Sequence, residues 1–228
     1  MTEKINKAKI VLVPGQGQGI QYLKNHDKSL TGQMYIFESL IREGAASLYN
    51  WARVNRKVGK SEFLNPVKFI RDFMDEYRLE KKYVNSQQAV FEFQTFINSY
   101  FPKILVGHSM GCNLLHNVIE YGDIPESVEL IVFCQGDYNK NLKIKNQAIH
   151  TRINQKRLKI INIYQPLDPM LMGSVFVNRK VPAGLVGTSD TLIQNYFWIV
   201  DHFNLHQTSV RSPKLLKLIN KYSNISIK

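Results

Sequence analysis

The chain has 228 residues, of which 44% are hydrophobic and 21% charged, a composition typical of a single soluble globular domain and not of a disordered or membrane-spanning chain. The formal net charge of +12 would attract an anionic membrane surface, nucleic acid or anionic substrates. The basic residues are scattered and show no pattern of a specific nucleic-acid-binding module, so a solvated basic surface is the simplest interpretation. No secretory leader is expected, and Cys112 and Cys134 fall in predicted buried elements as free thiols, so we expect a cytoplasmic protein.

The first predicted element is a buried strand over Lys9–Val13, a continuous apolar run that leads into a glycine-rich segment at 14–19. An amphipathic helix is expected over Gln33–Glu43, ending at Gly44, because apolar residues recur there at helical spacing. Ser47–Val54 is a candidate strand. The glycine-rich segment lacks the spacing of a dinucleotide-binding loop, so no nucleotide cofactor is expected.

Two further helices are predicted before residue 103. The first follows Pro66 and carries a regular apolar face as far as Tyr77, after which Arg78–Tyr83 reads as a charged connector. Ser86 is placed to cap the second helix, whose apolar face extends to Tyr100.

The most informative stretch follows, where the apolar run at 104–106 enters Gly107-His108-Ser109-Met110-Gly111 and a helical pattern leaves it. A Gly-x-Ser-x-Gly segment between a strand and a helix is the form of a nucleophile elbow, a sharp turn that exposes a serine. Glycine at 107 and 111 removes the side chains that would collide across the turn. Ser109 then lies at a helix N-terminus, where the Met110 N–H is a candidate oxyanion donor.

Strands and helices continue to alternate after the elbow. A helix is expected over Ala148–Lys156, and Ser212-Pro213 begins a last one. The further strands are expected over Val128–Phe133, Lys159–Tyr164 and Tyr196–Val200. This alternation predicts an α/β fold in one domain, 1–228, with a compact, mostly parallel sheet of about six strands and helices on both faces. Functional side chains of such sheets gather at the carboxyl ends of the strands.

The segment Ile104–Asn113 resembles the elbow of the α/β-hydrolase superfamily, in its lipase, esterase and thioesterase branches. The resemblance implies an α/β-hydrolase fold and a serine hydrolase that cleaves a carboxylic ester or thioester through an acyl-enzyme. It also implies an acid and then a histidine downstream of Ser109, and a second oxyanion N–H in the loop after the first strand, which we place at Gln16. No cofactor or metal is implied.

The acid and the base must come from the residues after Ser109. Asp168 follows the strand that carries the acid in this superfamily, whereas Asp137 follows the preceding strand and Asp190 lies further on. His206 and His202 both lie between the last predicted strand and the last helix. His206 is the favoured base because its place seven residues before Pro213 resembles the position of the catalytic histidine in α/β-hydrolases. The four-residue spacing of the two histidines also fits a metal site, but no Glu-x-x-His motif accompanies it.

Two other functions stay open. Pro14-Gly15-Gln16-Gly17 together with the elbow is similar to the malonyl-CoA:acyl-carrier-protein transacylase family, which implies an acyltransferase using serine and histidine without an aspartate. The arginine that this family needs after the elbow helix is missing through Phe133. A binding protein without catalysis on the same fold is the other alternative.

Met170–Val177 could line an acyl pocket, form a mobile cover or be a buried strand.

Overall fold

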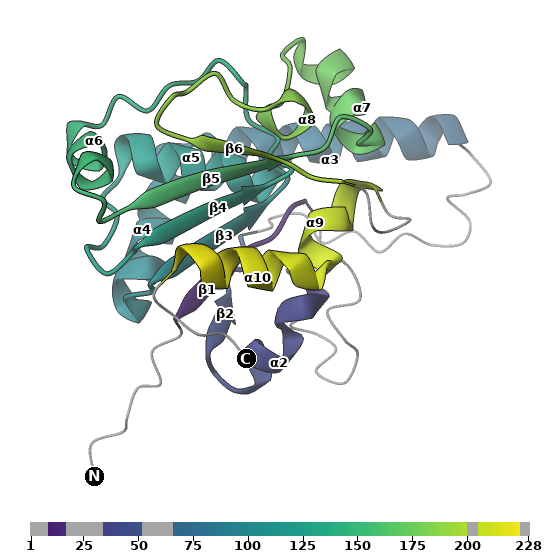
Figure 1. The fold of residues 1–228 in the computed structure, drawn as a ribbon. Helices are drawn as coiled ribbons and strands as arrows, with labels where there is room; N and C mark the ends of the chain where they lie inside the picture. Colours follow the sequence, from purple (N-terminus) through teal and green to yellow (C-terminus); the bar gives the residue numbers. More distant parts are fainter. Residues whose placement is uncertain (1–8, 17–33, 52–65, 200–204, 224–228) are drawn as a thin grey trace.

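The computed structural model describes residues 9–16, 34–51, 66–199 and 205–223, which build helices around one parallel sheet (Figure 1). Six strands lie in the order β2-β1-β3-β4-β5-β6, and each neighbouring pair is parallel. The strands are β1 Ile10–Val13, β2 Ala46–Leu48, β3 Ile104–His108, β4 Leu130–Cys134, β5 Lys159–Tyr164 and β6 Gln194–Phe197. The expected α/β class with a parallel sheet is therefore confirmed.

The helices connect successive strands and cover the sheet. The helical elements are η1 Tyr35–Phe37, α2 Glu38–Arg42, α3 Pro66–Val84, α4 Gln87–Tyr100, α5 Met110–Tyr121, α6 Gln147–Asn154, α7 Pro169–Asn178, α8 Ala183–Val186, η3 Leu205–Gln207, α9 Thr208–Arg211 and α10 Pro213–Tyr222. Ser86 caps α4 by accepting the Ala89 N–H, and Ser212 caps α10 by accepting the Lys214 N–H, as their positions in the sequence predict.

Both faces of the sheet are buried, because alternate residues of each central strand point into different cores. On one face Leu105 and Phe133 pack among the buried side chains of α4 and α5. On the other face Val106 and Val132 pack with α2, α9 and α10. In Figure 1 the helix α10 crosses one side of the sheet, and α4 and α5 lie behind it. This two-sided burial explains why the central strands read as continuous apolar runs rather than as alternating ones.

Several predicted boundaries are shifted in the structure. The strands expected over Lys9–Val13 and Lys159–Tyr164 are confirmed as β1 and β5. The candidate strand at Ser47–Val54 is shorter, ending at Leu48, and its last three residues lie outside the described part. The strand expected from Tyr196 begins two residues earlier, where Gln194 pairs with Ile161 of β5.

One prediction about local structure is wrong, and one alternative considered for another segment is excluded. Arg78–Tyr83 is the last part of helix α3, which continues to Val84 because no proline or glycine interrupts it and lysines occupy its final turn. Met170–Val177 lies within helix α7, so the buried strand considered there is excluded. The Asp168 carboxylate caps this helix and Pro169 occupies its first turn, where the missing N–H costs no hydrogen bond.

Candidate active site

The candidate catalytic residues lie on segments at one edge of the sheet, where the parallel strands end, and among them a direct contact joins Asp168 and His206. Ser109 directly follows β3, and Asp168 lies four residues beyond the end of β5. His206 lies in η3, which comes after β6 in the chain and contacts α7, the helix that Asp168 caps. Segments up to about a hundred residues apart in the sequence therefore lie at the same edge of the sheet.

Ser109 has a backbone conformation that few non-glycine residues adopt. Its φ is 52° and its ψ is −121°, far from the helical region in which Met110 begins α5. The Ser109 N–H donates to the Cys134 carbonyl at 3.0 Å, and the Ser109 carbonyl accepts from the N–H of Asp137 at 3.0 Å and of Cys112 at 3.1 Å. These bonds hold the strained turn in place. The side chain is half-buried and does not cap α5.

The glycines of the pentapeptide allow a close approach of the neighbouring backbone. A Cβ atom at Gly111 would overlap the carbonyl oxygens of Val13 and Pro14, and one at Gly107 would lie 2.7 Å from the Leu115 side chain. The loop after β1 therefore runs directly against the start of α5. The Trp51 indole N–H fixes this loop by donating to the Pro14 carbonyl at 2.7 Å.

The two proposed oxyanion donors flank this contact. Met110 is the first residue of α5, where backbone N–H groups lack partners within the helix, and Gln16 lies in the half-buried turn two residues beyond Pro14. The rest of the glycine-rich segment, from Gly17 to Gly19, lies outside the described residues.

Asp168 and His206 form a hydrogen-bonded pair. The distance from His206 Nδ1 to Asp168 Oδ2 is 2.7 Å, and the carboxylate is fully buried whereas the imidazole keeps 12% of its surface exposed. The other carboxylate oxygen, Oδ1, accepts the N–H groups of Met170 and Leu171 at 3.0 and 3.1 Å. Oδ2 also accepts from the side-chain amide of Gln135 at 2.8 Å.

The hydrogen bonds keep Asp168 ionised despite its burial. Burial acts to raise the pKa of Asp168, but the hydrogen bond and charge interaction with His206, together with the Leu171 N–H and the Gln135 amide, outweigh it and lower the pKa. An ionised carboxylate only accepts hydrogen bonds, so Nδ1 of His206 carries the proton in this contact.

His108 holds the backbone of His206. Its ring is fully buried, and burial together with the nearby His206 lowers the pKa of His108 to about 3, so that the ring is neutral at physiological pH. Its Nε2 lies 2.8 Å from the His206 carbonyl oxygen and therefore donates to it. The two imidazole centroids are 4.9 Å apart.

The alternative acids have other partners. Asp190 accepts the backbone N–H of Ile144 at 2.7 Å and of Leu192 at 3.0 Å, so it stabilises a loop. Asp137 binds Lys81 at 2.9 Å and the Tyr77 hydroxyl at 2.6 Å. The alternative base, His202, lies outside the described residues.

Asp137 belongs to a polar cluster that the sequence does not indicate. The Asp137 cluster consists of Tyr77, Lys81, Asp137, Ser174 and Asn178, and joins α3, α7 and the segment after β4. Ser174 donates to Asp137 Oδ1 at 2.5 Å, and Asn178 donates to the hydroxyls of Tyr77 and Ser174. Burial, then the charge and hydrogen bond of Asp137, raise the pKa of Tyr77, so its hydroxyl stays protonated and donates.

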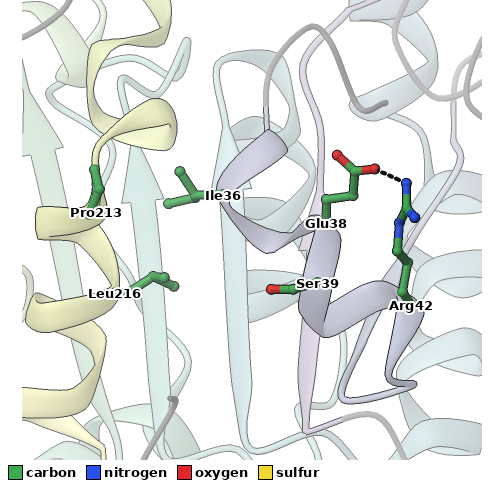
Figure 2. A pocket seen from close by; sticks show the side chains of 6 residues that line it. All are labelled: Ile36, Glu38, Ser39, Arg42, Pro213 and Leu216. Carbon is green, nitrogen blue, oxygen red and sulfur yellow. Dashed lines mark hydrogen bonds and ion pairs between the residues drawn. The ribbon is translucent and has the colours of Figure 1, made fainter. Parts of the chain in front are cut away.

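A shallow depression lies away from these residues, between the α2 and α10 helices (Figure 2). It has a volume of about 480 Å³ and is wide open to solvent. The side chains around it are Ile36, Glu38, Ser39, Arg42, Pro213 and Leu216. Its charged groups, Glu38 and Arg42, are bound to each other. None of the candidate catalytic residues lines it, so we assign it no role in the chemistry.

Among the residues that the structure describes, no three histidine, cysteine or acidic side chains are grouped to hold a metal ion. In the same residues, none of the helices combines the length and the apolar character needed to cross a membrane. Cys112 and Cys134 are free and buried, as expected from their positions.

No protein-family model matches the chain, and no curated protein matches its sequence. The geometry at the edge of the sheet therefore has to carry the functional interpretation.

Proposed function

We propose that the chain is a serine hydrolase of the α/β-hydrolase type that cleaves a carboxylic ester or thioester. The observation that carries the proposal is the 2.7 Å contact between His206 Nδ1 and the buried carboxylate of Asp168, at the edge where Ser109 occupies a strained strand-to-helix turn. The order of serine, acid and histidine along the chain is the order found in α/β-hydrolases. The strand order, with these residues after β3, β5 and β6, supports the same fold type.

The proton positions follow from the Asp168 contact. Because Nδ1 of His206 donates to an ionised carboxylate, the neutral ring has its lone pair on Nε2, which is the atom that would accept the Ser109 hydroxyl proton. Ser109 Oγ would then attack the carbonyl carbon of the substrate. Asp168 stabilises the imidazolium that forms and keeps the ring oriented, without itself taking the proton.

The remaining steps conserve atoms and charge. The negative charge on the carbonyl oxygen would be bound by the N–H groups of Met110 and Gln16 at the elbow. When the tetrahedral intermediate collapses, the alcohol or thiol leaves with the proton from Nε2, and Ser109 carries the acyl group as an ester. Water, deprotonated by His206, then attacks this ester, releases the carboxylic acid and restores the Ser109 hydroxyl.

The surface next to Asp168 favours a substrate with an apolar acyl group. Helix α7 has no charged residue, and its exposed side chains include Met170, Met172 and Phe176 with 49%, 43% and 85% of their surface accessible. Together with the net charge of +12, this surface suits an amphiphilic, anionic substrate or an anionic membrane surface. We propose that the protein acts on such substrates in the cytoplasm.

The acyltransferase alternative is weaker because of one contact. The transacylase resemblance implies a histidine that works without an aspartate, whereas His206 is bound to the Asp168 carboxylate. A binding protein without catalysis would have no need of a strained serine, but only a chemical test separates it from an enzyme.

A fluorophosphonate probe followed by peptide mass spectrometry tests the proposal. We expect the wild-type protein to be labelled at Ser109 and to hydrolyse a short p-nitrophenyl ester, with both activities lost in Ser109→Ala. Ser99→Ala is the matched control, because Ser99 is exposed on α4 and its hydroxyl donates to the Phe96 carbonyl of the same helix. Absence of labelling, or ester hydrolysis that survives in Ser109→Ala, would exclude the serine mechanism.

A further inference from the structure

The side chain of Gln135 occupies an unusual position beside the Asp168–His206 pair. Gln135 is the first residue after β4, is fully buried, and has a φ of 49°, in the left-handed region that glutamine rarely adopts. Its backbone N–H donates to the Ile163 carbonyl at 2.9 Å. Helix α8 packs so tightly against this turn that a Cβ atom at Gly184 would overlap the Gln135 backbone. The backbone around Gln135 is therefore rigidly held.

The amide of Gln135 is saturated with hydrogen bonds. Nε2 donates one hydrogen to Asp168 Oδ2 at 2.8 Å and the other to the Leu205 carbonyl at 2.7 Å. Oε1 accepts from the Ser209 hydroxyl at 2.9 Å and from the Ser209 N–H at 3.4 Å. These partners fix the orientation of the amide, since the flipped form would face the carboxylate and the carbonyl with an oxygen.

The two acceptors of the Gln135 amide are the two groups that set the geometry of His206. Asp168 Oδ2 is the same oxygen that binds His206 Nδ1, and Leu205 is the residue before His206 in η3. On the other side of His206, its own carbonyl is held by His108. The imidazole is thus placed through its ring partner and through its backbone, and Gln135 contacts both.

We infer that Gln135 is a positioning residue, which fixes the Asp168 carboxylate and the backbone of His206 relative to each other through one amide. This inference rests on the proposed function, in which His206 must accept a proton from Ser109. Gln135 itself contacts none of the reacting atoms. Its effect is geometric, because a displacement of the imidazole of about 1 Å is enough to cost on the order of a hundredfold in rate.

Gln135→Met tests the inference, because methionine has a similar length and shape but neither donates nor accepts as the amide does. We expect kcat for p-nitrophenyl ester hydrolysis to fall by about 10- to 100-fold while KM changes by less than about twofold. Ser209→Ala is the second variant, which keeps Gln135 but removes one of its restraints, and a smaller loss of about two- to fivefold is expected.

The matched control is Asn162→Leu. Asn162 is also a fully buried amide, which donates to the Ala183 carbonyl and to Asn195 and accepts from the Tyr138 hydroxyl. Within the described residues, none of these hydrogen bonds goes to Asp168, Leu205 or His206. Its substitution should destabilise the fold comparably and leave kcat of the folded protein unchanged. If kcat falls equally in Gln135→Met and Asn162→Leu, the loss is general and the inference is wrong.

The ring N–H of His206 gives a readout that does not depend on turnover. We expect a strongly hydrogen-bonded Nδ1–H proton resonance in the wild type, assigned by its loss in His206→Gln, and a shifted or broadened signal in Gln135→Met but not in Asn162→Leu. An unchanged resonance in Gln135→Met would overturn the inference. If the resonance moves as expected but Ser109 is never labelled, the positioning of the pair stands and the proposed function fails.

Discussion

Asp137 and Asp168 are two buried carboxylates at the ends of neighbouring parallel strands, yet they bind different kinds of partner. Asp168 accepts from an imidazole, an amide and two backbone N–H groups. Asp137 binds the ammonium group of Lys81 and the hydroxyls of Tyr77 and Ser174. The Asp168 contacts orient the partly exposed imidazole of His206. The Asp137 contacts instead connect α3, α7 and the segment after β4. Position after a strand therefore does not decide the role of a carboxylate; its partner does.

Helix α7 connects the two carboxylates. Its first turn is capped by Asp168, and Ser174 and Asn178 on its later turns belong to the Asp137 cluster. The helix is held at both ends, so loss of either carboxylate is expected to affect its stability. Only loss of Asp168 should affect the chemistry directly.

The largest expected difference is between Asp168→Asn and Asp137→Asn in ester hydrolysis. We expect Asp168→Asn to lower kcat by about 10³- to 10⁴-fold, because an amide no longer fixes the tautomer of His206 or stabilises its charged form. Asp137→Asn should leave kcat of the folded protein within about threefold. Steady-state kinetics on folded samples measures both, and equal losses in the two variants would contradict the distinction.

The second effect is on stability and concerns Asp137. Asp137→Asn should lower the free energy of unfolding by about 3 kcal/mol, because it leaves the mostly buried Lys81 ammonium without its ion pair. Urea unfolding followed by circular dichroism measures the change. The double variant Asp137→Asn, Lys81→Met should recover part of the loss; if it is less stable than Asp137→Asn alone, the ion pair is not the cause.

The third effect is the loss of stability at acidic pH. It depends on His108, which binds the backbone of His206, the partner of Asp168. The pKa of His108 is about 3 in the folded protein and 6.5 in a free side chain, so between these values the unfolded chain binds a proton that the folded protein does not. Stability is therefore lost as the pH falls below about 6.5. At pH 4.5 the loss due to this residue is about 3 kcal/mol.

His108→Gln should remove this component, because glutamine can still donate to the His206 carbonyl but does not titrate. The difference in unfolding free energy between pH 7 and pH 4.5 is expected to be smaller in this variant than in the wild type by about 2 to 3 kcal/mol. His150→Gln is the control, since His150 lies on α6 and contacts the Ile144 carbonyl. The same pH dependence in His108→Gln and wild type would contradict the assignment.

The smallest expected effect concerns the hydrogen bond between Ser174 of α7 and Asp137. Ser174→Ala removes one hydrogen bond to Asp137 and should lower the free energy of unfolding by about 1 kcal/mol, with kcat unchanged. Thermal unfolding and ester hydrolysis on the same sample measure both. A loss of kcat larger than about tenfold would show that the Asp137 cluster takes part in the chemistry.

The central strands and the elbow could be predicted from the sequence because the signals there are local. The apolar runs of β1 and β5 are long and buried on both faces, and the glycines of the elbow are needed for close backbone contacts around Ser109. Asp168 and His206 could be selected from the expected chain order, and the structure pairs them. The assignment of α/β-hydrolase activity to these residues stays a proposal.

In helix α7 the sequence contains a helix signal, but the apolar residues that follow it suggest another structure. Its run of valine and methionine suggests a strand or a loop, whereas the Asp168-Pro169 pair at its start is a helix N-terminal signal. The extension of α3 is similar, since charged residues after Tyr77 suggest a connector although nothing in them breaks a helix.

The hydrogen-bond partners of His108, Gln135 and Lys81 could not be predicted from the sequence. Their partners are 33 to 98 residues away along the chain, as in the contact of His108 with the His206 carbonyl. Hydrogen bonds of this range depend on how the strands are ordered in the sheet, and a local pattern contains no information about that order.

The most direct test of the account is a double-mutant cycle on Ser109 and His206. We expect Ser109→Ala and His206→Gln each to lower kcat for p-nitrophenyl ester hydrolysis by about 10⁴-fold or more, and the double variant to be no slower than the slower single variant, because residues that act as one unit lose their effect together. Losses that multiply in the double variant, or a single variant that keeps its activity, would contradict the claim that Ser109 and the His206–Asp168 pair act together.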